Sequence, residues 1–145
     1  MPGSKVTTIA NGSQIGAKMA TILVAEDEKD IRELISFSLR YGGFEVEEAV
    51  NGIEAVEKAR RLRPDLIIMD VRMPRKTGYE ACKELKEADE TRDIPIVFLS
   101  AKGQEAEIKQ GMELGAVDYI LKPFETGDLP RRMAEILREA TRRKK

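Results

Sequence analysis

Five short apolar runs alternate with helix-like patterns from about residue 21 onward, and this alternation limits the possible folds more than any other feature of the sequence. Each run is short enough to form a single β-strand. The five runs are Ile22–Ala25, Phe44–Ala49, Leu66–Met69, Ile94–Leu99 and Val117–Leu121. Strands that alternate with helices in this way form a parallel sheet covered by helices on both faces. The sequence therefore predicts an α/β fold built from five βα units.

Apolar side chains between the runs recur every three to four residues, which is the spacing of one helical face. After the first run, the predicted stripe is Ile31, Leu34, Ile35, Ser38 and Leu39. The pair Gly42-Gly43 would end that helix. The run Phe44–Ala49 alternates as an edge strand would, whereas the runs beginning at Ile22, Leu66 and Ile94 are nearly continuous. With right-handed crossovers, these units favour a doubly wound, flavodoxin-like sheet of strand order 2-1-3-4-5 with five helices.

Composition excludes several classes of function. The net charge of −1 argues against electrostatic binding of nucleic acids or membranes by the whole molecule. The sequence contains no histidine and one cysteine, Cys82, so histidine catalysis and an internal disulfide framework are excluded. No apolar run approaches the roughly 20 residues that span a bilayer. We therefore expect a cytoplasmic protein.

The chain divides into three segments by composition. Residues 1–18 are rich in Gly, Ser and Thr and are expected to be a flexible leader, although a short hairpin using Val6–Ile9 and Gln14–Ile15 is an alternative. Residues 19–140 form the predicted domain, which is long enough to bury a core of its own. Residues 141–145 form a basic C-terminal tail.

Residues that are candidates for a functional site follow four of the five runs. They are Glu26, Asp27, Asp70, Ser100, Lys122 and Pro123. The carboxyl ends of parallel strands meet at one rim, and ligands bind where the strand order reverses, here between the first and third strands. Any one of these acids could equally lie in a solvated loop and cap the next helix. Because such residues follow four strands and meet at the predicted reversal of strand order, a ligand-binding site is favoured. Three neighbouring carboxylates repel one another unless a cation is present, and oxygen ligands without His or Cys favour Mg²⁺ or Mn²⁺.

The stretch Thr21–Leu137 resembles the receiver domain of two-component response regulators, of which the chemotaxis regulator is a single-domain example. The matching segments are ILVAEDE, PDLIIMDVRMPRKTG, IPIVFLSA and GAVDYILKPF. The resemblance implies that Asp70 is the phosphoacceptor, modified to 4-aspartylphosphate. It also implies that Mg²⁺, or Mn²⁺ in its place, binds Asp27, Asp70 and the backbone carbonyl of Arg72, with Glu26 acting through a water.

The same resemblance assigns the remaining site residues. Lys122 and Ser100 would contact the phosphoryl group, Ser100 and Tyr119 would form the switch, and the peptide bond before Pro123 would be cis. Two departures from the family pattern are mild. The acid pair is Glu-Asp rather than Asp-Asp, and the loop reads Thr77-Gly78 where an acidic residue usually precedes the glycine.

The resemblance further implies a place in a phosphorelay. A sensor histidine kinase or a phosphotransfer protein would donate the phosphoryl group, and the domain would promote its own phosphorylation and dephosphorylation without being an enzyme in the usual sense. The face made by the fourth helix, the fifth strand and the fifth helix would then control a partner. A single-domain regulator acting on a downstream protein is favoured over a receiver domain excised from a larger DNA-binding transcriptional regulator. We expect a monomer or a phosphorylation-promoted dimer that contacts neither nucleic acid nor membrane directly.

Two other classes of function fit the sequence less well. A phosphohydrolase of the haloacid-dehalogenase type needs a second acid two residues after its nucleophile, and that position is Arg72, which cannot act as a general acid. A flavin or nucleotide binder of the same topology needs a loop rich in Gly, Ser or Thr after the first strand. Here that loop is Glu26–Asp30, which would repel phosphate.

Overall fold

Five parallel strands form a single sheet in the part of the chain that the computed structural model describes, which is residues 14–15, 18–101 and 105–143. The strands are β3 Thr21–Ala25, β4 Glu45–Ala49, β5 Leu66–Asp70, β6 Ile96–Ala101 and β7 Asp118–Lys122. Their order is β4-β3-β5-β6-β7, which confirms the predicted order 2-1-3-4-5. The strand order therefore reverses between β3 and β5, and a crevice is expected outside their carboxyl ends.

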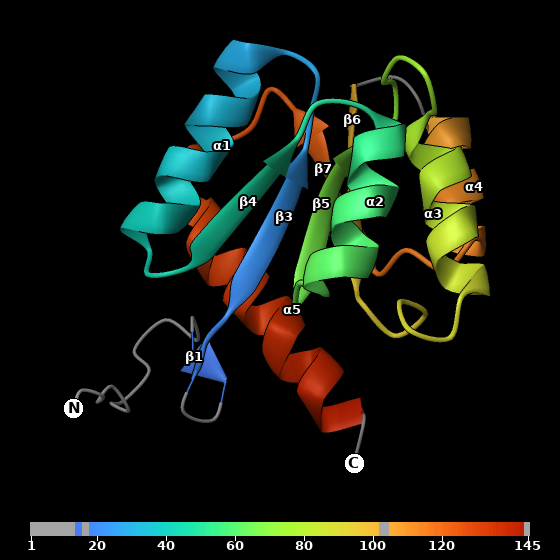
Figure 1. Ribbon diagram of the computed structural model, residues 1–145. Coiled ribbons are helices and arrows are strands. Elements are labelled where there is room, and N and C mark those ends of the chain that lie inside the picture. Colours follow the sequence, from blue (N-terminus) through green and yellow to red (C-terminus); the bar gives the residue numbers. More distant parts are fainter. Residues whose placement is uncertain (1–13, 16–17, 102–104, 144–145) are drawn as a thin grey trace.

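Helices cover both faces of the sheet (Figure 1). They are α1 Lys29–Tyr41, α2 Gly52–Leu62, α3 Gly78–Glu87, α4 Glu105–Glu113 and α5 Leu129–Arg143. Helices α1 and α5 pack on one face, while α2, α3 and α4 lie on the other. Within the described residues, no helix is long and apolar enough to cross a membrane.

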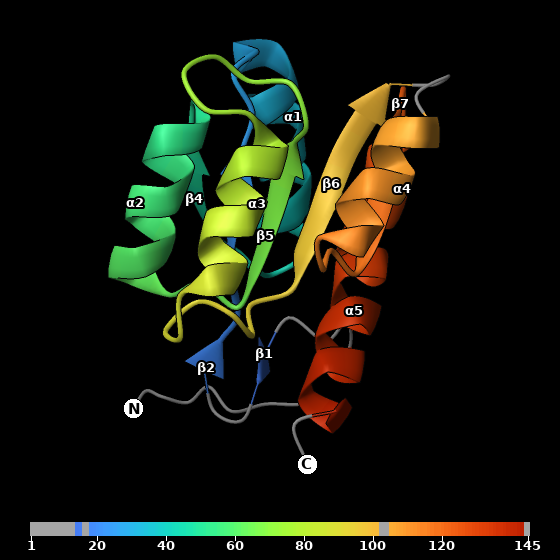
Figure 2. The same cartoon turned by 90° about the vertical axis from the view of Figure 1, so that its right-hand side faces the viewer.

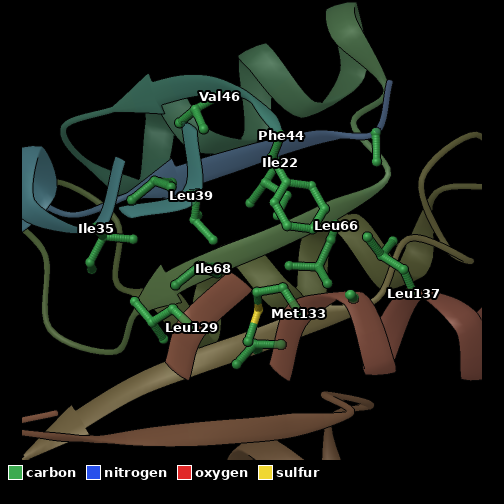
Figure 3. Close-up of a cluster of buried hydrophobic side chains, with 14 of the residues drawn as sticks. Ile22, Ile35, Leu39, Phe44, Val46, Leu66, Ile68, Leu129, Met133 and Leu137 are labelled. Atoms are coloured by element: carbon green, nitrogen blue, oxygen red, sulfur yellow. The ribbon is translucent and has the colours of Figure 1, made fainter. Parts of the chain in front are cut away.

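Successive side chains of each central strand point to opposite faces of the sheet and so contribute to two separate hydrophobic cores. In β3, Ile22 and Val24 belong to the cluster under α1 and α5, whereas Leu23 and Ala25 belong to the cluster under α2 and α3. Figure 3 shows the first of these clusters, in which side chains of α1 and α5 pack against those of the strands. Because strands buried on both faces need apolar residues at every position, the nearly continuous runs of β3, β5 and β6 follow directly. Strand β4 alternates between exposed and buried positions and lies at an edge, as predicted.

The buried face of α1 differs from the predicted stripe. Ile35 and Leu39 are buried as expected, but Leu34 is 51% exposed and Ser36 is buried instead. Adjacent helical residues differ by about 100° in direction, so Leu34 and Ser36 lie on opposite sides of Ile35. The rotation of the helix about its axis, which decides between them, is set by tertiary packing and cannot be read from two adjacent apolar residues.

A small antiparallel pair precedes the main sheet. Strand β1, Gln14–Ile15, pairs with β2, Lys18–Met19. The sequence predicted either a flexible leader or a hairpin that used Val6–Ile9, and that run lies outside the described residues. At the other end of the domain, the first residues of the predicted basic tail continue helix α5 as far as Arg143.

Candidate functional site

The carboxyl ends of three strands bring three acids and one lysine together. Glu26 and Asp27 directly follow β3, Asp70 is the last residue of β5 and Lys122 is the last residue of β7. One carboxylate oxygen from each of Glu26, Asp27 and Asp70 lies within 4.8 Å of the others. The Lys122 Nζ lies 2.8 Å from Asp70 Oδ2 and 3.3 Å from Glu26 Oε1. The predicted convergence of strand ends therefore exists as a compact charged cluster.

Burial makes this cluster electrostatically unusual. Glu26 is fully buried and Asp70 is 5% exposed, whereas Asp27 is exposed. Burial, followed by the hydrogen bond with Asp70, raises the pKa of Glu26 to about 8 although Lys122 opposes the shift. Without a cation in the site, Glu26 therefore favours its protonated form up to a higher pH than an exposed glutamate does. Glu26 Oε1 has no hydrogen-bond partner among the described residues and lies 3.3 Å from Lys122 Nζ.

Lys122 remains charged in this setting. Its burial acts to lower the pKa of the ammonium group, but the hydrogen bond and the charge of Asp70, together with the charge of Glu26, outweigh burial and raise that pKa. The peptide bond that joins Lys122 to Pro123 is cis. The Lys122 ammonium group faces Asp70 from the carboxyl end of β7, at the same edge of the sheet.

The loop between β5 and α3 folds back over Asp70. The Arg72 N–H donates to Asp70 Oδ1 at 3.0 Å, and the Gly78 N–H donates to the Val71 carbonyl at 2.9 Å. A Cβ on Gly78 would overlap the Asp70 carbonyl, so this close return requires glycine. Thr77 caps α3 in a capping box with Glu80. Thr77, which departs from the family pattern, thereby has a structural role that its T-x-x-E spacing could have revealed.

Ser100 and Tyr119 lie on the adjacent strands β6 and β7. Ser100 is 2% exposed and belongs to β6, whereas the sequence placed it one step beyond the strand. The partner of Asp70 in the β6 register is Leu99, so Ser100 is the next residue along. Tyr119 pairs with Phe98 and packs against the core under α3 and α4. Because side chains alternate along a strand, Ser100 points to the same face of the sheet as Phe98.

Two contacts next to the site were not predicted from the sequence. The Arg72 guanidinium forms an ion pair with Glu107 of α4 at 2.7 Å, and the Tyr79 hydroxyl donates to the Glu107 carbonyl. Both contacts join residues far apart in the chain, and neither follows from a local pattern.

The cluster stands at the switch point of the sheet, where a phosphate-binding relative of this topology would instead offer free backbone N–H groups. Acids at that position, opposed by a lysine, are the arrangement that the sequence resemblance to signalling receiver domains implied. The chain belongs to the response regulator receiver domain family, whose model matches residues 22–134.

Known proteins of this family resemble the chain in sequence and in structure. The transcriptional regulator RpaA of Synechocystis, named as DNA-binding, is 37% identical over 86% of the chain and 52% of its own length. The chain spans about half the length of the curated relatives it matches. A putative response regulator from Chloroflexus aurantiacus has a TM-score of 0.78 at 36% identity, covering 82% of this chain and 98% of its own.

A third relative carries a metal. The receiver domain of sensor histidine kinase PA1611 from Pseudomonas aeruginosa has a TM-score of 0.74 at 33% identity, covering 81% of this chain and 96% of its own. In that structure a magnesium ion is coordinated in the active-site cleft.

Proposed function

We propose that Asp70 accepts a phosphoryl group from the phosphohistidine of a sensor kinase or phosphotransfer protein, and that the α4–β7–α5 face then changes. The observation that carries this proposal is the double contact of the buried Asp70 carboxylate. Its Oδ1 accepts from the Arg72 N–H at 3.0 Å, and its Oδ2 lies 2.8 Å from the Lys122 ammonium. The carboxylate is thus held in one orientation beside a cation, as a nucleophile for phosphoryl transfer must be.

The acidic cluster fits a hard divalent cation. It offers carboxylate oxygens only, and one buried oxygen, Glu26 Oε1, has no hydrogen bond within the described residues. We infer that Asp27, Asp70 and the Arg72 carbonyl hold Mg²⁺ directly and that Glu26 acts through a water, with Mn²⁺ as a substitute. When bound, the cation supplies charge neutralisation for one oxygen of the transferring phosphoryl group.

The protein's own residues supply the rest of the transfer. An Asp70 oxygen forms the new bond to phosphorus while the bond from phosphorus to the donor imidazole breaks, and the imidazole leaves. The transition state spreads charge over three equatorial oxygens, so positioning and charge stabilisation dominate its catalysis. Lys122 pairs with one oxygen, and Ser100 donates its hydroxyl to another. Attack of water on the aspartyl phosphate later releases phosphate and restores Asp70.

Acetyl phosphate with Mg²⁺ tests this function directly. The expected result is the gain of one phosphoryl mass by the intact protein, followed by its slow loss as the acyl phosphate hydrolyses. The measurement is intact-protein mass spectrometry before and after acid or hydroxylamine treatment. Unchanged mass at saturating donor and metal would contradict the proposed function.

The signalling face has features that support partner binding. A shallow pocket of about 400 Å³ lies between β7 and α5. Its lining includes Tyr119, Leu121, Phe124, Leu129 and Arg132. Because the Arg132 guanidinium donates to the Tyr119 carbonyl at 2.6 Å, a change at Tyr119 would reach α5. We infer that the output is a protein contact at this face, made by a separate downstream protein or by a fused output domain.

Ser100→Ala should separate phosphorylation from signalling. Phosphoryl transfer is expected to persist, because Asp70 and Lys122 remain, but a contact made only with the phosphoryl group is lost. A charge-assisted hydrogen bond is worth about 1.5–3 kcal/mol. Its loss should therefore reduce the active-to-inactive ratio roughly 10- to 150-fold. The measurement is the NMR shift of Tyr119 on adding beryllofluoride, a phosphoryl mimic.

Ser36→Ala is the matched control for this measurement, because Ser36 is equally buried and lies on α1, beneath the opposite face of the sheet. This control should keep the full shift. A shift of wild-type size in Ser100→Ala would mean that the hydroxyl does not couple the site to the signalling face.

A further inference from the structure

An ion pair joins the loop after Asp70 to helix α4. Arg72 Nη2 lies 2.7 Å from Glu107 Oε2, and the Glu107 side chain is only 29% exposed although Arg72 is 66% exposed. Partial shielding of the carboxylate strengthens such a pair relative to one in open solvent. Glu107 belongs to the first turns of α4, so the contact bridges two elements that meet in space but are separated by α3 and β6 in the sequence. Figure 1 shows the β5–α3 loop above α3 and the start of α4.

Tyr79 adds a second link at the same residue of α4. Its hydroxyl donates to the Glu107 carbonyl, and burial raises the pKa of this hydroxyl to about 12, so it stays a donor throughout the physiological range. The Tyr79 ring meets the Phe98 ring edge-on, with centroids 5.3 Å apart. Gly111 lets α4 approach these rings, since a Cβ there would lie 2.5 Å from Phe98. Helix α4 is therefore packed against β6, and Tyr79 of α3 reaches it at Glu107. Figure 2 shows α4 beside β6.

Arg72 contacts the candidate site through its main chain. Its N–H donates to Asp70 Oδ1 at 3.0 Å, and its carbonyl is a proposed metal ligand. One residue thus touches the phosphoacceptor with its backbone and α4 with its guanidinium. A displacement of the Arg72 main chain, caused by a phosphoryl group or a metal, would be passed to Glu107.

The geometry points to Glu107 as a positioning residue that couples the loop after Asp70 to α4, along a path separate from that of Ser100 and Tyr119. This inference rests on the proposed function, because it concerns how the same site is read out. A bound group shifts a conformational equilibrium only through contacts that differ between the two states. The Arg72–Glu107 pair supplies such a contact for α4. The hydrogen bond of Ser100 with the phosphoryl group supplies one for β7, through Tyr119.

The test compares wild type with Glu107→Gln, Arg72→Gln and the double variant, each in the full 145-residue chain saturated with beryllofluoride and Mg²⁺. The readouts are the amide shift of Gly111, which reports on α4, and that of Tyr119, which reports on β7. Glu107→Gln should reduce the Gly111 shift by at least about half and leave the Tyr119 shift unchanged. Because Arg72 and Glu107 act as one pair, the double variant should be no worse than either single variant.

Glu139→Gln is the matched control, since Glu139 forms surface ion pairs with Arg142 and Arg143 at the end of α5. It should leave both shifts intact. A full Gly111 shift in Glu107→Gln would overturn the coupling role. Equal losses at Gly111 and Tyr119 would also overturn it, because Glu107 would then support the fold in general. If wild type shows no shift and takes no phosphoryl group from acetyl phosphate, the proposed function itself fails and the coupling role falls with it.

Discussion

Asp70→Asn is expected to abolish labelling by acetyl phosphate while the fold survives. The amide is nearly isosteric with the carboxylate, so the Arg72 N–H can still donate to the side-chain oxygen that replaces Oδ1. A neutral amide cannot attack phosphorus, however, and no aspartyl phosphate can form. Asp70 also contributes to raising the pKa of Glu26. The substitution should therefore lower that pKa, although burial, its largest cause, remains, and should maintain or raise thermal stability without Mg²⁺.

The measurement combines intact mass with thermal unfolding in the absence of metal. Asp89→Asn is a suitable control, because it removes an exposed carboxylate at the end of the domain that faces away from the acidic cluster. The control should be labelled at the wild-type rate. Stoichiometric acid-labile phosphate on Asp70→Asn would show that another carboxylate is the acceptor.

The sheet and the position of the site could be predicted because both depend on short-range patterns. Continuous apolar runs predict strands buried on both faces, and helical stripes between them fix parallel crossovers, so the strand order follows. Because the carboxyl ends of parallel strands share one edge of the sheet, the polar residues that follow those runs must lie along that edge. Asp70 and Lys122 come together in this way although 52 positions separate them in the chain.

Other features could not be predicted because they depend on how elements rotate and meet. The exposure of Leu34 is set by the rotation of α1, which two adjacent apolar residues leave undecided. The ion pair between Arg72 and Glu107 joins long, flexible side chains 35 positions apart, and charge patterning along one helix cannot reveal it. The raised pKa of Glu26 likewise arises mainly from burial of its side chain, which an acidic residue after a strand does not by itself imply.

Removal of the divalent cation should stop phosphorylation as completely as loss of the acceptor. EDTA is expected to abolish labelling by acetyl phosphate, and Asp27→Ala should abolish Mg²⁺ binding together with labelling. Asp27 is the exposed member of the cluster, so its side chain offers oxygens at the lowest desolvation cost. Few protein oxygens would contact the ion and waters would complete its octahedron, so we expect a dissociation constant on the order of millimolar. Mg²⁺ titration followed by tyrosine fluorescence or NMR measures the binding.

The pKa of Glu26 gives this prediction a defined pH dependence. Folding raises that pKa from 4.5 to about 8, so the folded protein without metal favours the protonated acid. The contribution of Glu26 to the free energy of unfolding therefore declines as pH rises from about 4.5 to 8. A proton on Glu26 competes with the cation. The apparent Mg²⁺ affinity should therefore rise with pH until about 8 and then level off. Asp30→Ala is the matched control, because it removes an exposed acid from the same segment but outside the cluster. Labelling that persists in EDTA, or Mg²⁺ affinity that falls as pH rises toward 8, would show that these acids do not hold the metal.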